Sequence, residues 1–195
     1  MAIRKFDASV KEIRAILRSE GLLYAVPRYQ RGFAWTRSQI QSLWNDILEE
    51  KYPGMFIGTI LLNHGEIVEE RVEIIDGQQR ILTVTIMLSV IRDKLAALGD
   101  DRGAHDVHTF YIASAPYIGA DDEPKVIPGP KIRNFFEKRI QYYPLDEDSD
   151  IPKPSNGEES RVNSARNFFN KSINDVLKEI ENEVDQISWL HEMSK

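Results

Sequence analysis

The stretch IIDGQQRILT, Ile74 to Thr83, sets the predicted fold of this chain. The apolar, β-branched residues that lead into it predict the end of a strand, and Ile81 to Leu95, which is apolar nearly all round, predicts a buried central helix. A strand that turns through a glycine into a helix leaves the first N–H groups of the helix unpaired, at the positive end of its dipole. Gly77 also lets a ligand approach the backbone closely. The stretch therefore predicts a position suited to a phosphate group.

The same residues allow a simpler interpretation, in which they only begin the helix. Asp76 is a good N-cap residue, and Gln79, three positions later, completes an aspartate version of the capping box. A helix capped in this way needs no ligand. However, the three long polar side chains of Gln78, Gln79 and Arg80 separate two apolar segments, and a cap uses only one of them. This excess of polar groups favours a binding site.

A second informative stretch is VPRYQRGFAW, Val26 to Trp35. It holds two arginines and a glutamine within four positions, and such side chains are costly to bury without polar or anionic partners. If the stretch is extended, Arg28 and Gln30 lie on one side of the chain, and Tyr29, Arg31 and Phe33 lie on the other. The alternative is a solvated turn beside packed aromatic residues. We expect Trp35 to pack, the alternative being that it stacks on a base.

Together, the two stretches resemble the motifs of a known family. Ile74 to Thr83 looks like the DGQQR signature of the amino-terminal domain of GmrSD-type modification-dependent restriction enzymes, which is also found in SspE-like phage-defence proteins. Val26 to Trp35 is similar to a second family element, P-x-x-Q-R-x-F/Y-x-W. The resemblance covers roughly Ile13 to Leu95 well and the rest loosely. It implies an α+β fold, with a small mixed sheet of ParB/sulfiredoxin-like type packed by helices and followed by a helical extension.

The resemblance also implies a function. The domain would bind and hydrolyse a nucleoside triphosphate and so regulate a modification-dependent restriction or phage-defence system. The implied cofactors are the nucleoside triphosphate and Mg²⁺, and Asp76 would hold the metal or orient the attacking water. From residue type and position, the predicted catalytic residues are Asp76, Gln78, Gln79 and Arg80, and the predicted nucleotide-binding residues are Arg28, Gln30, Arg31, Gly77 and Thr83. The predicted nucleic-acid-binding residues are Trp35 and Arg37.

Two other functions stay open. A non-hydrolysing ParB-like module that binds DNA or senses its modification would explain why Gly21 to Asn45 contains three arginines and no acidic residue. A structural adaptor would use Ser160 to Leu190, which predicts one long amphipathic helix, to dock a nuclease domain or subunit or to form a homo-oligomer. The chain has no Walker-type GxxxxGK[ST] loop, so a hydrolysing site would differ from that of P-loop enzymes.

Composition narrows the class of protein further. A net charge of −6 over 195 residues argues against coating nucleic acid by bulk charge. The absence of cysteine excludes disulfides and thiolate metal sites, and agrees with the cytoplasm as the predicted location. The most apolar run, Ile81 to Ile91, is shorter than the roughly 20 residues that span a bilayer, so we expect no membrane contact.

The predicted organisation has two parts. Residues 1–100 form the ParB/sulfiredoxin-like nucleotide-binding core, and residues 101–195 form a mostly helical extension without any cluster resembling an HNH nuclease site. The chain is then either a fragment of a longer protein or a family member without a nuclease domain. Within the core, a strand at Leu22 to Val26, a helix from Thr36 to Lys51, and a hairpin of Phe56 to Leu62 with Ile67 to Ile75 are predicted, and a loop is predicted at Ala120 to Pro130.

Overall fold

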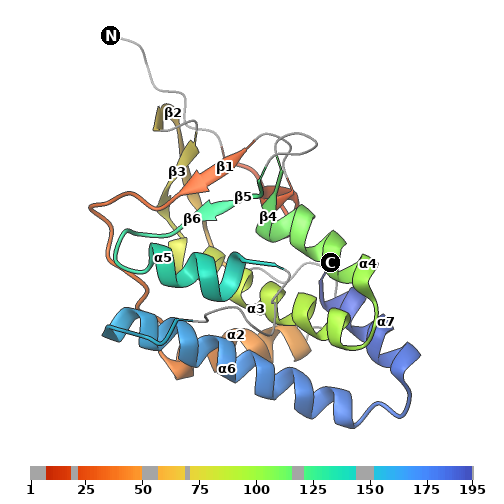
Figure 1. The fold of residues 1–195 in the computed structure, drawn as a ribbon. Helices are drawn as coiled ribbons and strands as arrows, with labels where there is room; N and C mark the ends of the chain where they lie inside the picture. The colour runs from red at the N-terminus through yellow and green to blue at the C-terminus, as the bar shows by residue number, and fades with distance from the viewer. Residues whose placement is uncertain are drawn as a thin grey trace.

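The computed structural model describes residues 8–18, 22–49, 57–68, 71–115, 121–143 and 152–194. The fold is α+β, as predicted, with a small mixed sheet and surrounding helices (Figure 1). Its α-helices are α1 Ile13–Leu17, α2 Arg37–Glu49, α3 Gln78–Ala97, α4 Asp101–Val107, α5 Arg133–Phe136, α6 Gly157–Lys178 and α7 Glu183–Met193, and two π-helical segments are η1 His108–Ile112 and η2 Glu137–Gln141. Its strands are β1 Leu23–Ala25, β2 Leu61–Val68, β3 Arg71–Asp76, β4 Ala113–Ser114, β5 Glu123–Pro124 and β6 Val126–Ile127.

The main sheet brings the two informative stretches to one edge. Its strand order is β2-β3-β1-β6, with β2 antiparallel to β3 and β1 parallel to both β3 and β6. Leu23 lies opposite Arg71 and Ala25 lies opposite Glu73. Because β1 and β3 run in the same direction, their carboxyl ends meet at the same edge of the sheet. The segment after β1 and the start of α3 therefore both begin at this edge.

Helix α3 is the centre of the core, as its composition predicts. Fifteen of its residues are buried, and α4, α6 and α7 pack against it (Figure 1). Two of its buried hydroxyls are satisfied within the helix, since Thr85 Oγ1 donates to the carbonyl of Ile81 at 2.9 Å and Ser89 Oγ donates to that of Ile86 at 2.7 Å. A helix fixed on all sides holds its first turn in one place, which a binding site requires.

The sheet is completed by the second half of the chain. Strand β6 pairs with β1, where Tyr24 lies opposite Val126 and Ala25 lies opposite Ile127. The prediction of a loop at Ala120 to Pro130 is therefore wrong for this part, because a strand of two residues between prolines leaves no periodic pattern to detect. The core also combines buried side chains from both halves. The division into a core of residues 1–100 and an extension stays a prediction.

Two other elements differ from their predictions. Strand β2 continues through Asn63, His64 and Gly65, which were expected to form the hairpin turn, and its pairing with β3 shifts register between Asn63 and Val68. A glycine within a strand often accompanies such an irregularity. Because glycine is also typical of turns, the sequence suggested a turn at this point.

The predicted final helix is two helices, α6 and α7. The second begins at a polar cap, in which the side chain of Asn182 accepts a hydrogen bond from the backbone N–H of Asp185 at 2.9 Å. Gln186 Nε2 then donates to the carbonyls of Leu177 and Ile180, at the end of α6, at 2.9 and 3.0 Å. The break has no glycine or proline, so the apolar spacing alone suggested a continuous helix.

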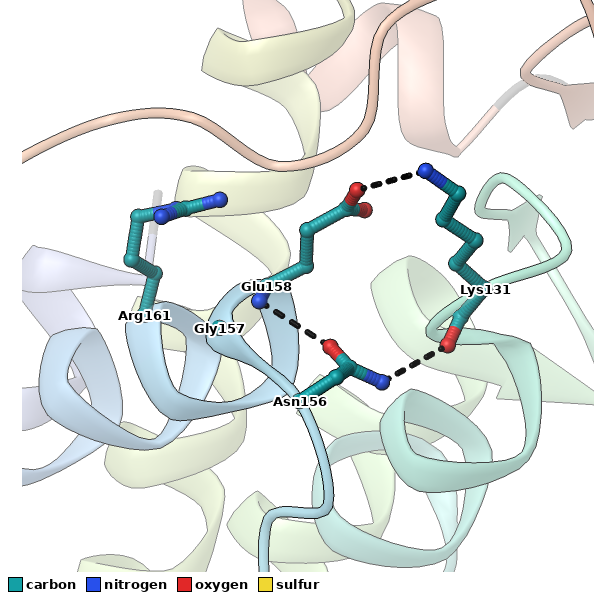
Figure 2. Close-up of a pocket in the computed structure, with 5 residues that line it drawn as sticks. All are labelled: Lys131, Asn156, Gly157, Glu158 and Arg161. Atoms are coloured by element: carbon teal, nitrogen blue, oxygen red, sulfur yellow. Dashed lines mark hydrogen bonds and ion pairs between the residues drawn. The ribbon is translucent and has the colours of Figure 1, made fainter.

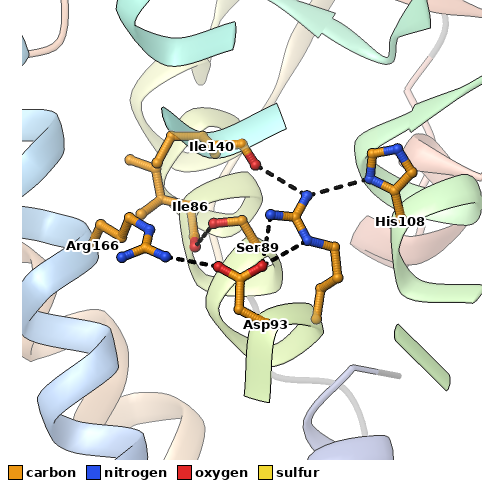
Figure 3. A network of polar contacts seen from close by, with 7 residues as sticks. Ile86, Ser89, Asp93, His108, Ile140 and Arg166 are labelled. Carbon is orange, nitrogen blue, oxygen red and sulfur yellow. Dashed lines mark hydrogen bonds and ion pairs between the residues drawn. The ribbon is translucent and has the colours of Figure 1, made fainter. Parts of the chain in front are cut away.

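A buried polar network joins α3 to three other elements. Arg92 is 0% exposed and donates to the Asp93 carboxylate at 2.9 Å, to the carbonyl of Ile140 at 3.2 Å and toward His108 Nδ1 at 3.3 Å. Arg166 of α6 donates to the other oxygen of Asp93 at 2.7 Å (Figure 3). The aspartate therefore lies between two guanidinium groups, and the network ties α3 to α6, η1 and η2.

His108 makes the stability of this network depend on pH. Burial, followed by the charge of Arg92, lowers the pKa of His108 below its ordinary value. As the pH falls below about 6.5, the unfolded chain therefore takes up a proton that the folded chain does not, and the free energy of unfolding should decrease. Urea unfolding between pH 7.5 and 5.5 measures this slope. His108→Gln should flatten it, whereas a substitution of the exposed His105 by Gln should change it much less; equal slopes in all three proteins would contradict the prediction.

Candidate functional site

The segment after β1 and the start of α3 contact each other directly. Gln30 Nε2 donates to the carbonyl of Ile75, near the end of β3, at 2.8 Å. The backbone N–H of Gln30 donates to the carbonyl of Pro27 at 3.0 Å, so residues 27–30 form a turn. The prediction of an extended segment with alternating sides is therefore wrong at this point, and Gln30 and Arg31 both face the same hollow.

Gln79 is the bridge between the two stretches. Its Nε2 donates to the carbonyl of Gly32 at 2.9 Å, and its Oε1 accepts hydrogen bonds from the backbone N–H groups of Ala34 at 2.8 Å and Trp35 at 3.3 Å. The side chain thus pairs with the backbone as a neighbouring strand would. These hydrogen bonds use both polar atoms of the Gln79 amide, and they hold the segment after β1 in place.

The start of α3 is not a capping box. Its N-cap is Gly77, and no side chain makes a cap hydrogen bond there. Asp76 is exposed at the end of β3, and Gln79 faces the other stretch. The simpler interpretation of the motif as a capped helix is therefore wrong, because its polar side chains serve contacts far away in the sequence.

Gln78 places a hydrogen-bond acceptor, its side-chain oxygen Oε1, inside the site. Its Nε2 donates to the carbonyl of Arg31 at 2.7 Å, which fixes the orientation of the amide. Its Oε1 is then directed elsewhere, is buried and has no hydrogen-bond partner within the described part of the chain. The residue is only 5% exposed. A buried acceptor without a partner costs about 1–3 kcal/mol, so this oxygen is suited to a donor from a ligand.

Two glycines in the left-handed region allow this close packing. Gly77 has φ 89°, and a Cβ there would lie 3.0 Å from the carbonyl oxygen of Thr59. Gly58 has φ 106°, and a Cβ there would lie 2.6 Å from Arg80 Nε. Arg80 Nη1 also donates to the carbonyl of Thr59 at 3.2 Å. The segment before β2 therefore supports both the turn and the arginine, a role that the sequence analysis missed although Gly58 lies inside an apolar strand-like run.

These contacts surround a hollow of about 170 Å³ at the edge of the sheet. Most of the predicted site residues line it: Gln30, Arg31, Trp35, Asp76, Gly77, Gln78, Gln79 and Arg80. Pockets for drug-sized ligands usually measure roughly 300–1,000 Å³, so the hollow is smaller than a typical site that encloses a whole ligand.

Three other predicted residues lie elsewhere. Arg28 is exposed in the turn and does not line the hollow. Thr83 is fully buried in α3, with its hydroxyl inside the core. Arg37 is exposed on α2, with its guanidinium 6.0 Å from the centre of the Phe168 ring.

The charge of the hollow favours an anion. Arg31 and Arg80 line it, and among the described residues neither makes an ion pair with a carboxylate. Asp76 is the single acid in the lining. Across the described ranges, no three histidine, aspartate or glutamate side chains gather as a metal-binding group. The lining therefore offers a cation one carboxylate, that of Asp76.

The chain matches a family model across nearly its whole length. Residues 12–193 match the model described as "GmrSD restriction endonuclease, N-terminal domain". The chain belongs to this family. Both stretches that surround the hollow lie inside the match, and so do β6 and α6, which means that this GmrSD-type domain includes the second half of the chain. A search of curated proteins found no match. Within the described ranges, none of the helices combines the length and the apolar character needed to cross a membrane.

Proposed function

We propose that this GmrSD-type domain binds and hydrolyses a nucleoside triphosphate with Mg²⁺, as the regulatory part of a cytoplasmic, modification-dependent restriction or phage-defence system that acts on DNA through a nuclease domain or subunit. Support comes from the family match and from the chemistry of the hollow. The observation that carries the proposal is the buried Oε1 of Gln78, beside Arg31 and Arg80: among the described residues, the oxygen has no hydrogen-bond partner and the two arginines make no ion pair. A ligand that satisfies all three groups must combine a negative charge with a hydrogen-bond donor.

A nucleotide combines these properties. Its phosphates suit Arg31, Arg80 and the first N–H groups of α3, and Gly77 leaves room for close approach. Its base or sugar supplies an N–H or O–H group for Gln78 Oε1. Hydrolysis would depend on positioning and on neutralising charge at the phosphates, for which Arg80 is the first candidate and Asp76 is the residue to hold Mg²⁺ or to orient water.

Calorimetry tests the proposal. ATP, GTP, CTP and UTP are titrated with Mg²⁺, beside inorganic triphosphate, which has the charge but not the donor. At least one nucleotide should bind about tenfold or more tightly than inorganic triphosphate, since an unmade bond at a buried polar group costs about 1–3 kcal/mol. Gln78→Met should remove most of this preference. The proposal fails if no nucleotide binds, or if inorganic triphosphate binds as well as every nucleotide.

A contact with single-stranded nucleic acid is the second candidate. Tyr29 is 74% exposed, and both Arg28 and Arg31 beside it are exposed as well. An exposed ring between cationic side chains suits base stacking and a phosphate backbone. A mobility-shift assay with a short single strand at low salt tests this candidate, and an unshifted strand with wild-type protein would exclude it.

A further inference from the structure

Helix α6 contacts the segment after β1 at Phe33, which lies between the positions that side chains of α3 bind. Arg161 Nε donates to the carbonyl oxygen of Phe33 at 2.8 Å, across 128 positions of sequence. Phe33 is fully buried, whereas Arg161 itself is exposed on α6. The exposed arginine side chain therefore binds a backbone carbonyl and is not part of the hydrophobic core.

Glu158 lies beside the same segment. A Cβ on Gly32 would lie 1.6 Å from Glu158 Oε2, so the carboxylate occupies the space that a side chain at position 32 would take. Its other oxygen, Oε1, lies 3.5 Å from Lys131 Nζ. Figure 2 shows Glu158 and Arg161 extending in the same direction from the first turns of α6, with Lys131 facing Glu158. The first turns of α6 therefore fit closely against Gly32 and Phe33.

Within the part of the chain that the structure describes, the backbone from Arg31 to Trp35 pairs with no strand and is held by side chains instead. Gln78 binds the carbonyl of Arg31, and Gln79 binds the carbonyl of Gly32. Gln79 also accepts from the N–H groups of Ala34 and Trp35. Only the carbonyl of Phe33, in the middle of this segment, is bound from α6. Without that bond, the segment would be free to move at its midpoint, between Arg31 and Trp35, which both line the hollow.

We propose that Arg161 is a positioning residue for the candidate site. Through the Phe33 carbonyl it fixes the segment that presents Arg31 and Trp35 to the hollow, so that α6, in the second half of the chain, sets the geometry of a site built by the first half. The effect on nucleotide binding rests on the proposed function, whereas the effect on the segment does not.

Two variants of similar length separate the hydrogen bond from the charge. In Arg161→Met, a methyl group replaces the Nε donor at about the same distance along the side chain. In Arg161→Gln, the amide Nε2 places an uncharged N–H donor at the position of the arginine Nε. Lys171→Met removes an exposed charge from the same helix and serves as the control, since Lys171 lies outside the hollow.

The first readout needs no nucleotide. The chain has three tryptophans, Trp35, Trp44 and Trp189, so 5-fluorotryptophan labelling gives three ¹⁹F signals that single Trp→Phe changes assign. In Arg161→Met the Trp35 signal should shift or broaden, while the Trp44 signal stays and reports an intact core. Arg161→Gln and Lys171→Met should keep all three signals. An unchanged Trp35 signal in Arg161→Met, or an equal change in Arg161→Gln, would overturn the positioning role.

The second readout is nucleotide affinity by calorimetry. Arg161→Met should bind the preferred nucleotide on the order of tenfold more weakly than wild type, and Arg161→Gln should stay close to wild type. Equal affinity of Arg161→Met and wild type would overturn the link to the site. If wild type binds no nucleotide but the Trp35 signal still responds to Arg161→Met, the proposed function fails while the positioning of the segment stands.

Discussion

Arg80→Ala is expected to lower nucleoside triphosphate turnover by about 10²–10³-fold, the effect of removing one donor aimed at developing charge. Arg80 lies in the first turn of α3 and lines the hollow. The close approach of Gly58 and the hydrogen bond to the Thr59 carbonyl restrict its guanidinium. Because a guanidinium has five N–H donors, a single bond to Thr59 leaves others for phosphate oxygens. A restricted cation needs little reorganisation when charge develops at the phosphates.

Phosphate release at saturating nucleotide and Mg²⁺ measures this prediction. Arg102→Ala, at an exposed position of α4 outside the hollow, removes the same type of side chain and should retain wild-type turnover. Thermal unfolding of both variants shows whether the contacts of Arg80 with Gly58 and Thr59 also support the fold. Wild-type turnover in a folded Arg80→Ala protein would show that the arginine has no part in catalysis.

The meeting of the two stretches was predictable because each carries its own local signal. β-branched residues before Gly77, an apolar helix after it, and a polar segment after a short strand all follow from sequence. Parallel pairing of β1 with β3 then places both at one edge. The site residues that line the hollow come from these two stretches alone.

The individual roles were less predictable, since they depend on contacts between distant positions. Gln79 matched the spacing of a capping box, yet it binds the backbone at Gly32, Ala34 and Trp35. Arg161 matched only the polar face of an amphipathic helix, and its contact with Phe33 leaves no pattern in either segment. Local spacing predicts helices and turns, but it does not show which backbone groups lack a partner.

The buried network of α3 carries the largest expected effect on stability. Asp93→Ala should lower the free energy of unfolding by about 3–5 kcal/mol, because removing one partner leaves a buried charge uncompensated. Arg92 would keep the Ile140 carbonyl and the Tyr143 ring, 5.0 Å from its guanidinium, but would lose its carboxylate. Arg166, which shares that carboxylate, would then face Arg92 as a like charge.

Urea unfolding measures the loss, and Asp175→Ala provides the matched control. Asp175 pairs with Lys178 at 3.2 Å on the surface of α6, where both side chains are more than half exposed. Such pairs contribute about 0–1 kcal/mol, so the control should unfold close to wild type. If Asp93→Ala unfolds no earlier than the control, the carboxylate is not needed to keep Arg92 buried.

A second substitution identifies the cause of the loss. In Asp93→Ala with Arg92→Met, the buried guanidinium is gone together with its partner, and a flexible apolar side chain takes its space. If the cost of Asp93→Ala comes from an unpaired buried cation, the double variant should be more stable than Asp93→Ala alone, although Met leaves the Ile140 carbonyl without its donor. If the cost comes instead from the lost attachment of α6 through Arg166, the double variant should be as unstable as Asp93→Ala or more so. The sign of the difference between the two variants therefore decides between charge burial and helix attachment.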